Sequence, residues 1–213
     1  MMLMSEPCPL CRNEADFFST ARKRAYHLCG RCGSVFMAPR HHLSVEAEKR
    51  RYEAHCNDVD DPRYRAFVRP LVDSVLEQCR PEHDGLDFGC GSGPVVSRLL
   101  AERGYLLAQY DPFFRDLPEL LERTYDYVIC CEVIEHFRDP AREFRLLRSL
   151  LNKGGRLFCQ TELYAPGIEL AGWPYANDTT HVFFYQQRTL EWIRDHFGFS
   201  ALVVSGRLAV FTA

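Results

Sequence analysis

The spacing of apolar positions changes along the chain and divides it into three segments. Up to about Pro39 the apolar runs are short and have no helical period. Over residues 45–79 apolar side chains recur every three or four positions, which predicts helix, and Pro62 and Pro70 are expected to divide that helix. From Leu86 onward short apolar runs alternate with helical patterns, which predicts a parallel sheet with helices on its faces.

The third segment predicts strands and helices in regular order. Its last two apolar runs flank Ser205-Gly206-Arg207 and predict an antiparallel hairpin at the end of the sheet. The expected fold class is α/β: a Rossmann-like, doubly wound, mostly parallel sheet with an antiparallel C-terminal hairpin. Three units are expected: a small module over 1–40, a helical lid or linker over 41–82 and the main domain over 83–213. The predicted strands are 86–88, 106–110, 127–131, 156–160, 201–204 and 208–212, and the predicted helices are 94–103, 141–151 and 187–197.

Composition narrows the class of protein. Apolar residues make up 46% and charged residues 26% of the 213 positions, which is typical of a globular protein. The longest apolar runs are far shorter than the ~20 residues that cross a bilayer. The first residues also lack the basic start and apolar run of a secretion signal, so a cytoplasmic protein without membrane contact is expected. Ten cysteines in such a chain indicate metal binding rather than disulfides.

A glycine-rich turn follows the first strand of the main domain. The segment Asp87-Phe88-Gly89-Cys90-Gly91-Ser92-Gly93 lies where that strand leads into a helix, so its glycines let backbone N–H groups approach a ligand. Asp111 follows Gly91 by twenty residues, at the end of the next strand. A carboxylate there can accept hydrogen bonds from both hydroxyls of a ribose. The turn and the acid together predict a nucleoside-containing cofactor.

The turn resembles the first motif of the class I S-adenosylmethionine-dependent methyltransferases, which has the form acid-x-Gly-x-Gly-x-Gly. The resemblance continues through Tyr125-Asp126-Tyr127-Val128-Ile129-Cys130-Cys131-Glu132-Val133-Ile134-Glu135-His136-Phe137, Asp139-Pro140 and Leu151-Asn152-Lys153-Gly154-Gly155, and it covers about Asp84 to the C-terminus. It implies S-adenosylmethionine as the cofactor, with its methionine end over the segment after the fourth strand. The implied cofactor-binding residues are Asp87, Gly89, Cys90, Gly91, Gly93, Asp111, Pro112, Phe113, Cys131 and Glu132.

The chain departs from that family at the adenine end. Only thirteen residues separate Asp111 from Tyr125, where the family usually has a helix and a further strand. The adenine-binding region is therefore expected to be abbreviated. Asp116 is a candidate for an adenine-binding acid. Phe113 or Phe114 is a candidate for covering the ring, although either side chain is equally compatible with the core.

Two pairs of cysteines in the first segment have the spacing of metal ligands. Cys8 and Cys11 form one CxxC pair, Cys29 and Cys32 form another, and seventeen residues separate them. Four thiolates complete a closed tetrahedral shell around Zn²⁺, so a structural zinc ribbon is predicted. A segment of ~40 residues has little apolar core of its own, which favours the metal over unpaired core thiols.

A second candidate metal site follows the fourth strand. Glu132, Glu135 and His136 lie in one short turn, and His181 occurs farther along. Such ligands can hold a divalent ion that lowers the pKa of an acceptor hydroxyl. The arrangement resembles the metal site of small-RNA terminal 2′-O-methyltransferases, and a related site in ubiquinone-type O-methyltransferases. Without a metal, His181 or His136 is a candidate general base, and Glu132 is a further catalytic candidate.

Aromatic residues surround His181 between the fifth strand and the last helix. Related methyltransferases place acceptor-binding loops in this region, and aromatic side chains can form the walls of a site for a planar substrate. A purely structural lid is the alternative. The candidate substrate-binding residues are Trp173, Tyr175, His181 and Tyr185.

Three hypotheses for the function follow. The first is methyl transfer from S-adenosylmethionine to an oxygen of a small metabolite, and the net charge of −3 favours it over a nucleic-acid substrate. The second is an RNA methyltransferase that recognises RNA through its ribbon, since residues 1–51 hold nine basic against five acidic side chains. The third is a cofactor- or zinc-binding adaptor without catalysis, which the short region after Asp111 would explain. The sequence does not indicate the oligomeric state.

Overall fold

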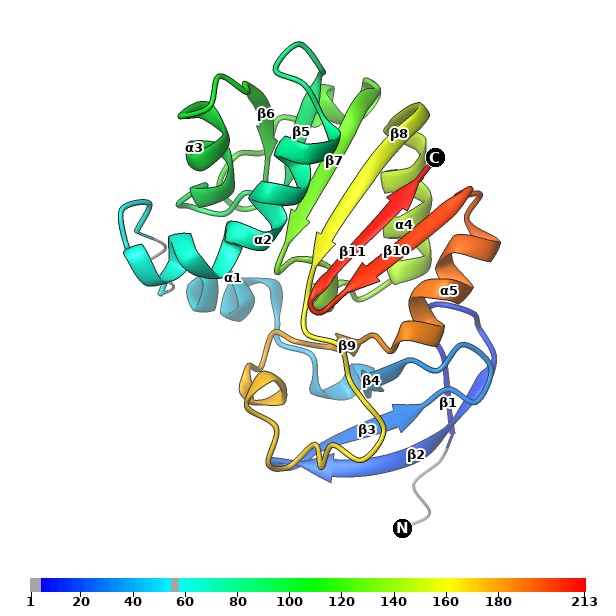
Figure 1. Cartoon of the computed structure of the whole chain (residues 1–213). Helices are drawn as coiled ribbons and strands as arrows, with labels where there is room; N and C mark the ends of the chain where they lie inside the picture. The colour runs from blue at the N-terminus through cyan, green and yellow to red at the C-terminus, as the bar shows by residue number, and fades with distance from the viewer. Residues whose placement is uncertain (1–4, 55–57) are drawn as a thin grey trace.

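The computed structural model describes residues 5–54 and 58–213 and contains two sheets (Figure 1). In the larger sheet the central strands are parallel and the last two are antiparallel. This confirms the mostly parallel α/β sheet and its C-terminal hairpin. Its six strands, in spatial order, are β10 (Ala201–Ser205), β11 (Leu208–Thr212), β8 (Leu151–Gln160), β7 (Tyr125–Cys131), β5 (Gly85–Phe88) and β6 (Leu107–Tyr110).

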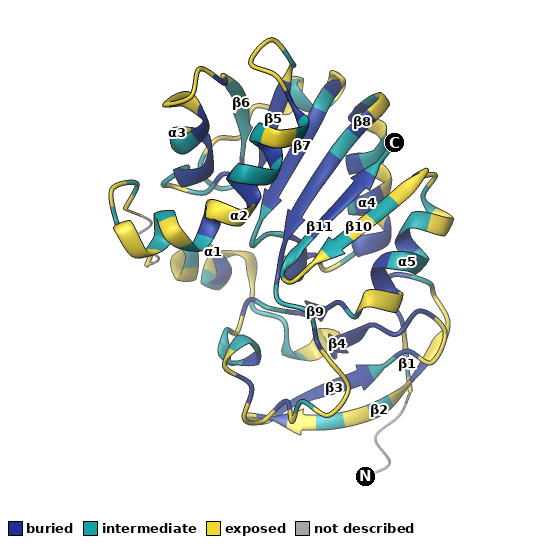
Figure 2. Ribbon diagram, in the orientation of Figure 1, coloured by how far each residue is buried: buried dark blue, intermediate teal, exposed yellow. Residues whose placement is uncertain are grey.

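Helices cover both faces of this sheet, and its central strands β5 and β7 are largely buried, whereas the edge strands β6 and β10 are only partly buried (Figure 2). On one face α2 (Pro62–Gln78) and α3 (Val95–Ala101) pack in a core with Ile129 and Phe158. On the other face α4 (Pro140–Ser149) and α5 (Gln187–His196) contribute to a second, larger core. The apolar faces of the predicted helices are therefore buried against the sheet, as a doubly wound fold requires.

Helix α2 contains Pro70, so the expectation that this proline divides the helix is wrong. Pro62 does begin α2, and Asp61 caps it by accepting a hydrogen bond from the Arg63 N–H at 2.9 Å. A proline within a helix removes one backbone hydrogen bond. The apolar face on both sides of Pro70 outweighs that loss because it is buried against the sheet, through Val68, Leu71, Val72 and Val75.

Strand β8 starts at Leu151, earlier than the predicted strand over 156–160. The Gly154-Gly155 pair therefore lies within this strand. Pairing with β7 is irregular here, because Tyr125 pairs with Leu151 whereas Tyr127 pairs with Arg156. Gly154 has a φ of 77°, so the two glycines form a bulge that leaves the strand continuous.

The sheet ends at β6. After Asp111 the chain turns back in a bridge to Arg115 and forms a short 3₁₀ helix, η2 (Pro118–Glu122), before it enters β7. None of the described residues between β6 and β7 forms a further strand. The abbreviated region that the sequence predicted is thus confirmed, and the outer edge of β6 is the edge of the sheet.

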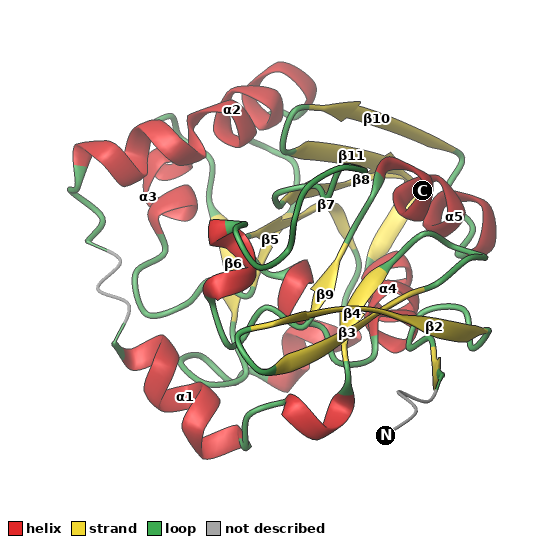
Figure 3. Cartoon of the chain, turned by 90° about the horizontal axis from the view of Figure 1, so that it is seen from below, coloured by secondary structure: helices red, strands yellow, loops and turns green. Residues whose placement is uncertain are grey.

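The smaller sheet combines the N-terminal segment with a short strand from residues 183–184. Four strands come from the first segment, and the fifth, β9, comes from between β8 and α5 and pairs with β4 (Figure 3). The two segments also share one apolar core, in which Phe36 stacks on Phe183. The expected boundary at residue 40 therefore divides one sheet, because residues 183–184 of the main domain form a strand of the N-terminal module. Its strands are β1 (Glu6–Pro7), β2 (Glu14–Ala21), β3 (Arg24–Leu28), β4 (Val35–Met37) and β9 (Phe183–Phe184).

The predicted lid or linker forms α1 (Val45–Glu53) and α2, and its residues 55–57 lie outside the described ranges. Ser44 caps α1 by accepting a hydrogen bond from the Ala47 N–H. The remaining elements are short 3₁₀ helices: η1 (Pro39–His41), η3 (Ile134–His136) and η4 (Pro174–Asn177). No helix within the described ranges is both long and apolar enough to cross a membrane.

Candidate active site

A cavity of about 810 Å³ opens beside the carboxyl ends of β5, β6 and β7. Ligand sites in open α/β sheets occur at these strand ends, and the volume falls within the range of roughly 300–1,000 Å³ for small-molecule pockets. Helices α1 and α2 contribute to its walls through Tyr52, Tyr64 and Phe67. Every residue that the sequence assigned to the cofactor lines this one cavity: Asp87, Gly89, Cys90, Gly91, Gly93, Asp111, Pro112, Phe113, Cys131 and Glu132.

The glycine turn has a backbone that only glycine adopts easily. Gly89 and Gly91 have φ values of 80° and 65°. A Cβ at Gly89 would also lie 2.6 Å from a methyl carbon of Val133, so the turn packs directly against the segment after β7. The Gly89 N–H donates to the Tyr110 carbonyl at 2.8 Å, which fixes the turn to the end of β6.

Asp111 connects the turn with the chain that follows β6. One carboxylate oxygen accepts the Gly91 N–H at 2.9 Å, and the other accepts the N–H groups of Phe113 and Phe114 at 2.8 and 3.1 Å. These bonds hold the carboxylate at the cavity wall, where its remaining lone pairs can accept ribose hydroxyls. The residues present therefore fit a nucleoside cofactor.

Asp87 connects the strand before the glycine turn with the helix after it. It is buried, and its carboxylate accepts a hydrogen bond from the Ser97 hydroxyl of α3 at 2.6 Å. Burial raises the pKa of Asp87 to about 6, because the charged form loses its hydration. This hydrogen bond joins β5 to α3 on the two sides of the glycine turn in the sequence.

At the other end of the cavity, Glu132 and Glu135 flank the Tyr175 hydroxyl. That hydroxyl contacts Glu135 Oε1 and lies 3.2 Å from Glu132 Oε2, while the Thr161 hydroxyl donates to Glu135 Oε2 at 3.1 Å. Burial raises the pKa of both carboxyl groups, and for Glu132 the charge on Glu135 adds to the shift. Glu132 has a φ of 52°, an uncommon conformation for this residue type that marks strained functional sites.

Arg207 neutralises part of this acidic cluster, and sequence reasoning missed it. It sits in the turn between β10 and β11, which the sequence identified only as a hairpin turn. Its guanidinium donates to Glu132 Oε2 and Glu162 Oε2, both at 2.9 Å, and lies over the Phe67 ring at 4.9 Å from the centroid. An arginine in a hairpin turn is normally solvated, so no sequence signal marked it.

The two predicted histidines come together at the cavity wall. Their ring centroids are 4.8 Å apart, although His136 belongs to η3 and His181 precedes β9. Each Nδ1–H donates to a backbone carbonyl, from His136 to Thr180 at 3.0 Å and from His181 to Tyr175 at 2.7 Å. In the neutral rings Nε2 therefore carries the lone pair. Burial lowers the pKa of His136, which favours the neutral ring.

The predicted metal ligands are only partly brought together. Potential ligand atoms of Glu135, His136 and His181 lie within 4.8 Å of one another. Glu132 is not in this group, because its Oε2 is held by Arg207 and Tyr175. Among the described residues its Oε1 is buried without a hydrogen-bond partner.

The predicted substrate residues occupy different positions. His181 lines the cavity, whereas Trp173, Tyr175 and Tyr185 are not among the lining residues. Tyr185 is fully buried and its hydroxyl donates to the Ile134 carbonyl at 2.9 Å, and the Trp173 indole donates to Glu162 at 2.8 Å. These aromatic side chains instead stabilise the segment between β8 and α5 that contains His181. The aromatic side chains that do reach the cavity from the lid are Tyr52, Tyr64 and Phe67.

Helix α1 is attached to the rim of the cavity mainly by charge. Glu48 pairs with Arg138, and Arg51 pairs with Asp178 at 2.8 Å. Tyr52 inserts between the two ends of the cavity, with its ring 5.5 Å from that of Phe113 and 5.3 Å from that of His136. Glu48 is the one fully buried residue of α1, so the ion pairs and the ring of Tyr52 hold this helix in place.

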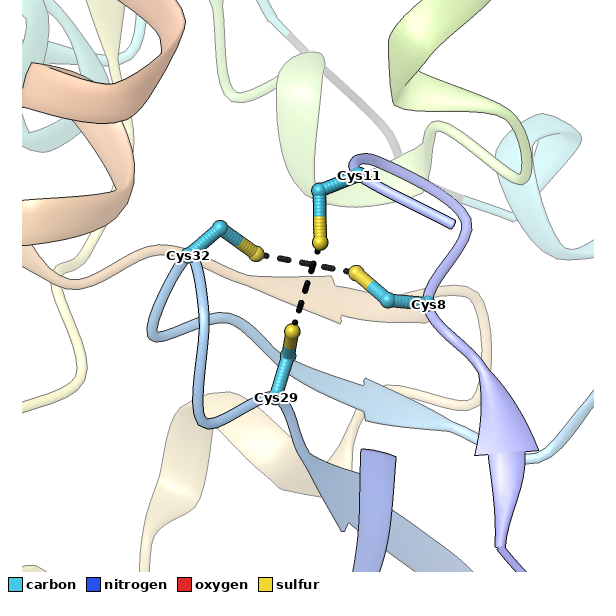
Figure 4. A group of neighbouring side chains, drawn as sticks. All are labelled: Cys8, Cys11, Cys29 and Cys32. Carbon is cyan, nitrogen blue, oxygen red and sulfur yellow. Dashed lines mark hydrogen bonds between the residues drawn. The ribbon is translucent and has the colours of Figure 1, made fainter. Parts of the chain in front are cut away.

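The four N-terminal cysteines converge outside this cavity (Figure 4). The Cys8 and Cys32 sulfurs are 3.6 Å apart, and those of Cys11 and Cys29 are 3.4 Å apart. Each CxxC pair is closed by a residue with positive φ, Arg12 at 62° and Gly33 at 78°. The sulfurs point toward one centre, which is the arrangement that a tetrahedral metal needs.

The cysteine module is tied to the main domain by polar contacts. Arg12 forms a two-oxygen ion pair with Asp139, the cap of α4, at 2.9 and 3.0 Å. Gln186 and Arg188, at the start of α5, donate to backbone carbonyls of the second cysteine loop. The module thus braces the starts of two helices that cover the main sheet.

Comparison with known proteins identifies the family. Residues 61–204 match the family model described as "Methyltransferase domain". This chain belongs to that family. The match confirms the enzyme class that the glycine turn predicted, and it begins after the cysteine module.

Among curated proteins, the methyltransferase is similar to ubiquinone biosynthesis O-methyltransferases. The relative from Sodalis glossinidius (strain morsitans) is 34% identical over 77 residues, which covers 36% of this chain and 31% of the relative. The relative from Leptothrix cholodnii (strain ATCC 51168 / LMG 8142 / SP-6) is 30% identical over 122 residues, which covers 44% and 52%. The matches thus span about a third to a half of the length of these relatives.

Solved structures share the fold. A 1,6-didemethyltoxoflavin-N1-methyltransferase from Burkholderia thailandensis, with bound 1,6-didemethyltoxoflavin and S-adenosylhomocysteine, has a TM-score of 0.57 at 18% identity and covers 93% of this chain and 98% of its own. A SAM dependent methyltransferase from Archaeoglobus fulgidus has a TM-score of 0.54 at 19% identity, covering 70% and 93%. The Rossmann-like methyltransferase fold is therefore confirmed.

Proposed function

We propose that this protein transfers the methyl group of S-adenosylmethionine to an oxygen of a small metabolite. One observation carries the proposal: a single cavity joins the glycine turn and Asp111 to the paired imidazoles of His136 and His181. The glycine turn and Asp111 suit a nucleoside, and the two imidazoles suit an acceptor that must lose a proton. Similarity to ubiquinone biosynthesis O-methyltransferases and to S-adenosylhomocysteine-bound methyltransferases supports the same cofactor and reaction.

The chemistry is an in-line displacement. S-adenosylmethionine held at the glycine turn and Asp111 would supply an electrophilic methyl group for the acceptor oxygen, with S-adenosylhomocysteine as the leaving group. Most of the acceleration would come from holding the two reactants in line. Without a bound ion, the Nε2 lone pair of His136 or His181 would take the acceptor proton, since both Nδ1–H groups donate to backbone carbonyls.

Charge around the histidines favours a neutral or cationic acceptor over RNA. Glu48, Glu132 and Asp178 line this end of the cavity. Their nearest cations, among them Arg207 and Arg51, are engaged in ion pairs with them. These arginines are therefore not available to bind a phosphate, so a nucleic-acid strand is disfavoured. Tyr52, Tyr64 and Phe67 suit a planar ring instead.

We also propose metal roles for both residue groups that the sequence singled out. Cys8, Cys11, Cys29 and Cys32 would hold a structural Zn²⁺, which would fix the loops that contact α4 and α5. Glu135, His136 and His181 would hold a divalent ion that polarises the acceptor hydroxyl and lowers its pKa. Glu132, which the sequence included as a fourth ligand, would instead remain paired with Arg207.

The decisive experiment has two parts on the same purified protein. Calorimetric titration should show S-adenosylmethionine and S-adenosylhomocysteine binding with a Kd in the micromolar range, and labelled cofactor should transfer its methyl group to a member of a panel of phenols, catechols and hydroxylated heterocycles. Cofactor binding without transfer to this panel or to total RNA would favour the non-catalytic adaptor. Absence of cofactor binding to the folded protein would contradict the proposed function itself.

Metal analysis separates the two metal roles. One zinc per chain that resists EDTA, and that is lost in Cys29→Ser, is expected for the cysteine site. If the histidine site holds an ion, chelation should abolish transfer and Mg²⁺, Mn²⁺ or Zn²⁺ should restore it. Full transfer in the chelated enzyme would contradict that ion and leave His136 or His181 as the base.

A further inference from the structure

Part of the cavity wall lies beyond Asp111 and is formed by residues outside the sheet. The proposed cofactor would have its methyl group near Glu132, at the end of β7, and its ribose at Asp111, at the end of β6. Its base must then extend past β6. Because the sheet stops at β6, no strand is available there within the described residues to contact the base.

The first turns of α4 occupy this end instead. Arg142, Glu143 and Leu146 line the same cavity as the glycine turn, and they belong to a helix that the sequence assigned only to covering the sheet. Phe113, Phe114 and Leu121, from the segment after β6, also line this cavity. A flat base therefore has apolar walls from the segment after β6 and polar groups from α4.

Glu143 combines partial burial at the cavity wall with a carboxylate that is available to a ligand. Its side chain is half-buried, and burial raises its pKa despite the nearby Arg142. Among the described residues its carboxylate forms no hydrogen bond or ion pair, whereas the neighbouring Asp139 both caps α4 and pairs with Arg12. Asp116, the acid that the sequence suggested for adenine, is not among the residues that line the cavity.

We propose that Glu143 recognises adenine, with its carboxylate accepting a hydrogen bond from the exocyclic 6-amino group. The proposal rests on the proposed cofactor. It gives α4 a binding role and replaces Asp116 as the adenine-reading acid. It also explains how the shortened segment after Asp111 is compatible with selective cofactor binding.

The test compares two ligands that differ at one position of the base. S-adenosylhomocysteine carries a 6-amino donor, whereas S-inosylhomocysteine carries a 6-oxo acceptor that would meet the carboxylate of Glu143. By calorimetry the wild type should bind the adenosyl ligand at least about tenfold more tightly, the range for a hydrogen bond to a charged group. In Glu143→Gln the amide can donate to the 6-oxo group, so the preference should fall to about threefold or less. In Asp116→Asn, the matched control, it should be unchanged.

The outcomes distinguish this proposal from the one on which it rests. A wild type that binds neither ligand overturns the proposed function. A wild type that binds both ligands, with a preference that Glu143→Gln and Glu143→Ala leave unchanged, overturns the role of Glu143 and keeps the function. Equal weakening of both ligands together with a lower Tm also overturns it, because that result indicates a structural role for Glu143.

Discussion

The cofactor end and the acceptor end of the cavity differ in how the chain builds them. The cofactor end comes largely from backbone groups and short-range contacts between two consecutive strands, β5 and β6, and includes the hydrogen bond from the Gly91 N–H to Asp111. The acceptor end gathers side chains from α1, η3, the loop before β9 and the β10–β11 turn, so Glu132 meets Arg207 across 75 residues of sequence. The geometry of the cofactor end depends on a local backbone conformation that few residue types adopt. The geometry of the acceptor end depends on the correct packing of distant segments.

The comparison predicts that the two ends can be inactivated separately, and the largest effect is expected at the acceptor end. His181→Ala should reduce methyl transfer to the identified acceptor by roughly 10²–10⁴-fold, because positioned acid–base groups contribute that much. Its affinity for S-adenosylhomocysteine should change by less than about threefold. Steady-state turnover and calorimetry measure the two quantities. His196→Ala, which alters an exposed histidine stacked on Trp192, is the control; full activity in His181→Ala would contradict a catalytic role.

At the cofactor end Gly89→Ala should lower the free energy of unfolding by ~2–5 kcal/mol. Positive φ costs an L-residue about 1–2 kcal/mol and overpacking about 1–3 kcal/mol. The new Cβ would lie 2.6 Å from Val133. Gly104→Ala isolates the backbone part, since Gly104 has a φ of 85° and no atom within 4 Å of the added Cβ. Urea unfolding compares the two variants; equal losses would show that contact with Val133 does not constrain the turn.

Asp111→Ala should weaken binding of S-adenosylhomocysteine at least about 30-fold, or ~2 kcal/mol. The change removes the acceptor of three N–H groups as well as the proposed contact with ribose. Asp126→Ala is matched to it, because Asp126 accepts the Asp84 N–H and the Asn152 amide away from the cavity. This control should lose stability but keep its affinity. Similar affinity losses in both variants would mean that Asp111 acts only through stability.

The smallest effect concerns Asp87 and pH. Its folded-state pKa is raised to about 6 from a usual value of 3.8, so the stability that it contributes is fully present below pH 3.8 and is lost as pH rises through 6. Between pH 5 and 7 the wild type should lose about 1 kcal/mol relative to Asp87→Asn, because one pKa unit corresponds to about 1.4 kcal/mol. Urea unfolding at several pH values measures the difference. A difference that stays constant with pH would show that Asp87 titrates normally in the fold.

The same contrast between short-range and long-range contacts decides how much of the fold could be predicted from the sequence. Alternating apolar runs predicted the strands of the main sheet, and thirteen residues between Asp111 and Tyr125 predicted the missing strand. Pro70 was misassigned because local propensity does not include burial of the α2 face against the sheet. The fifth strand of the small sheet, β9, has two residues, too few for any periodic pattern.

The sequence by itself determined the glycine turn, Asp111 and the two CxxC pairs, because their function depends on residue type and short spacing. It also selected Glu135, His136 and His181, but not which of them meet. Only the tertiary structure decided that Arg207 pairs with Glu132, that Trp173 and Tyr185 support a loop instead of lining the cavity, and that α4 reaches the end beyond Asp111. The physical reason is that these positions are set by the packing of elements far apart in the chain, and local patterns of polarity contain no information about such contacts.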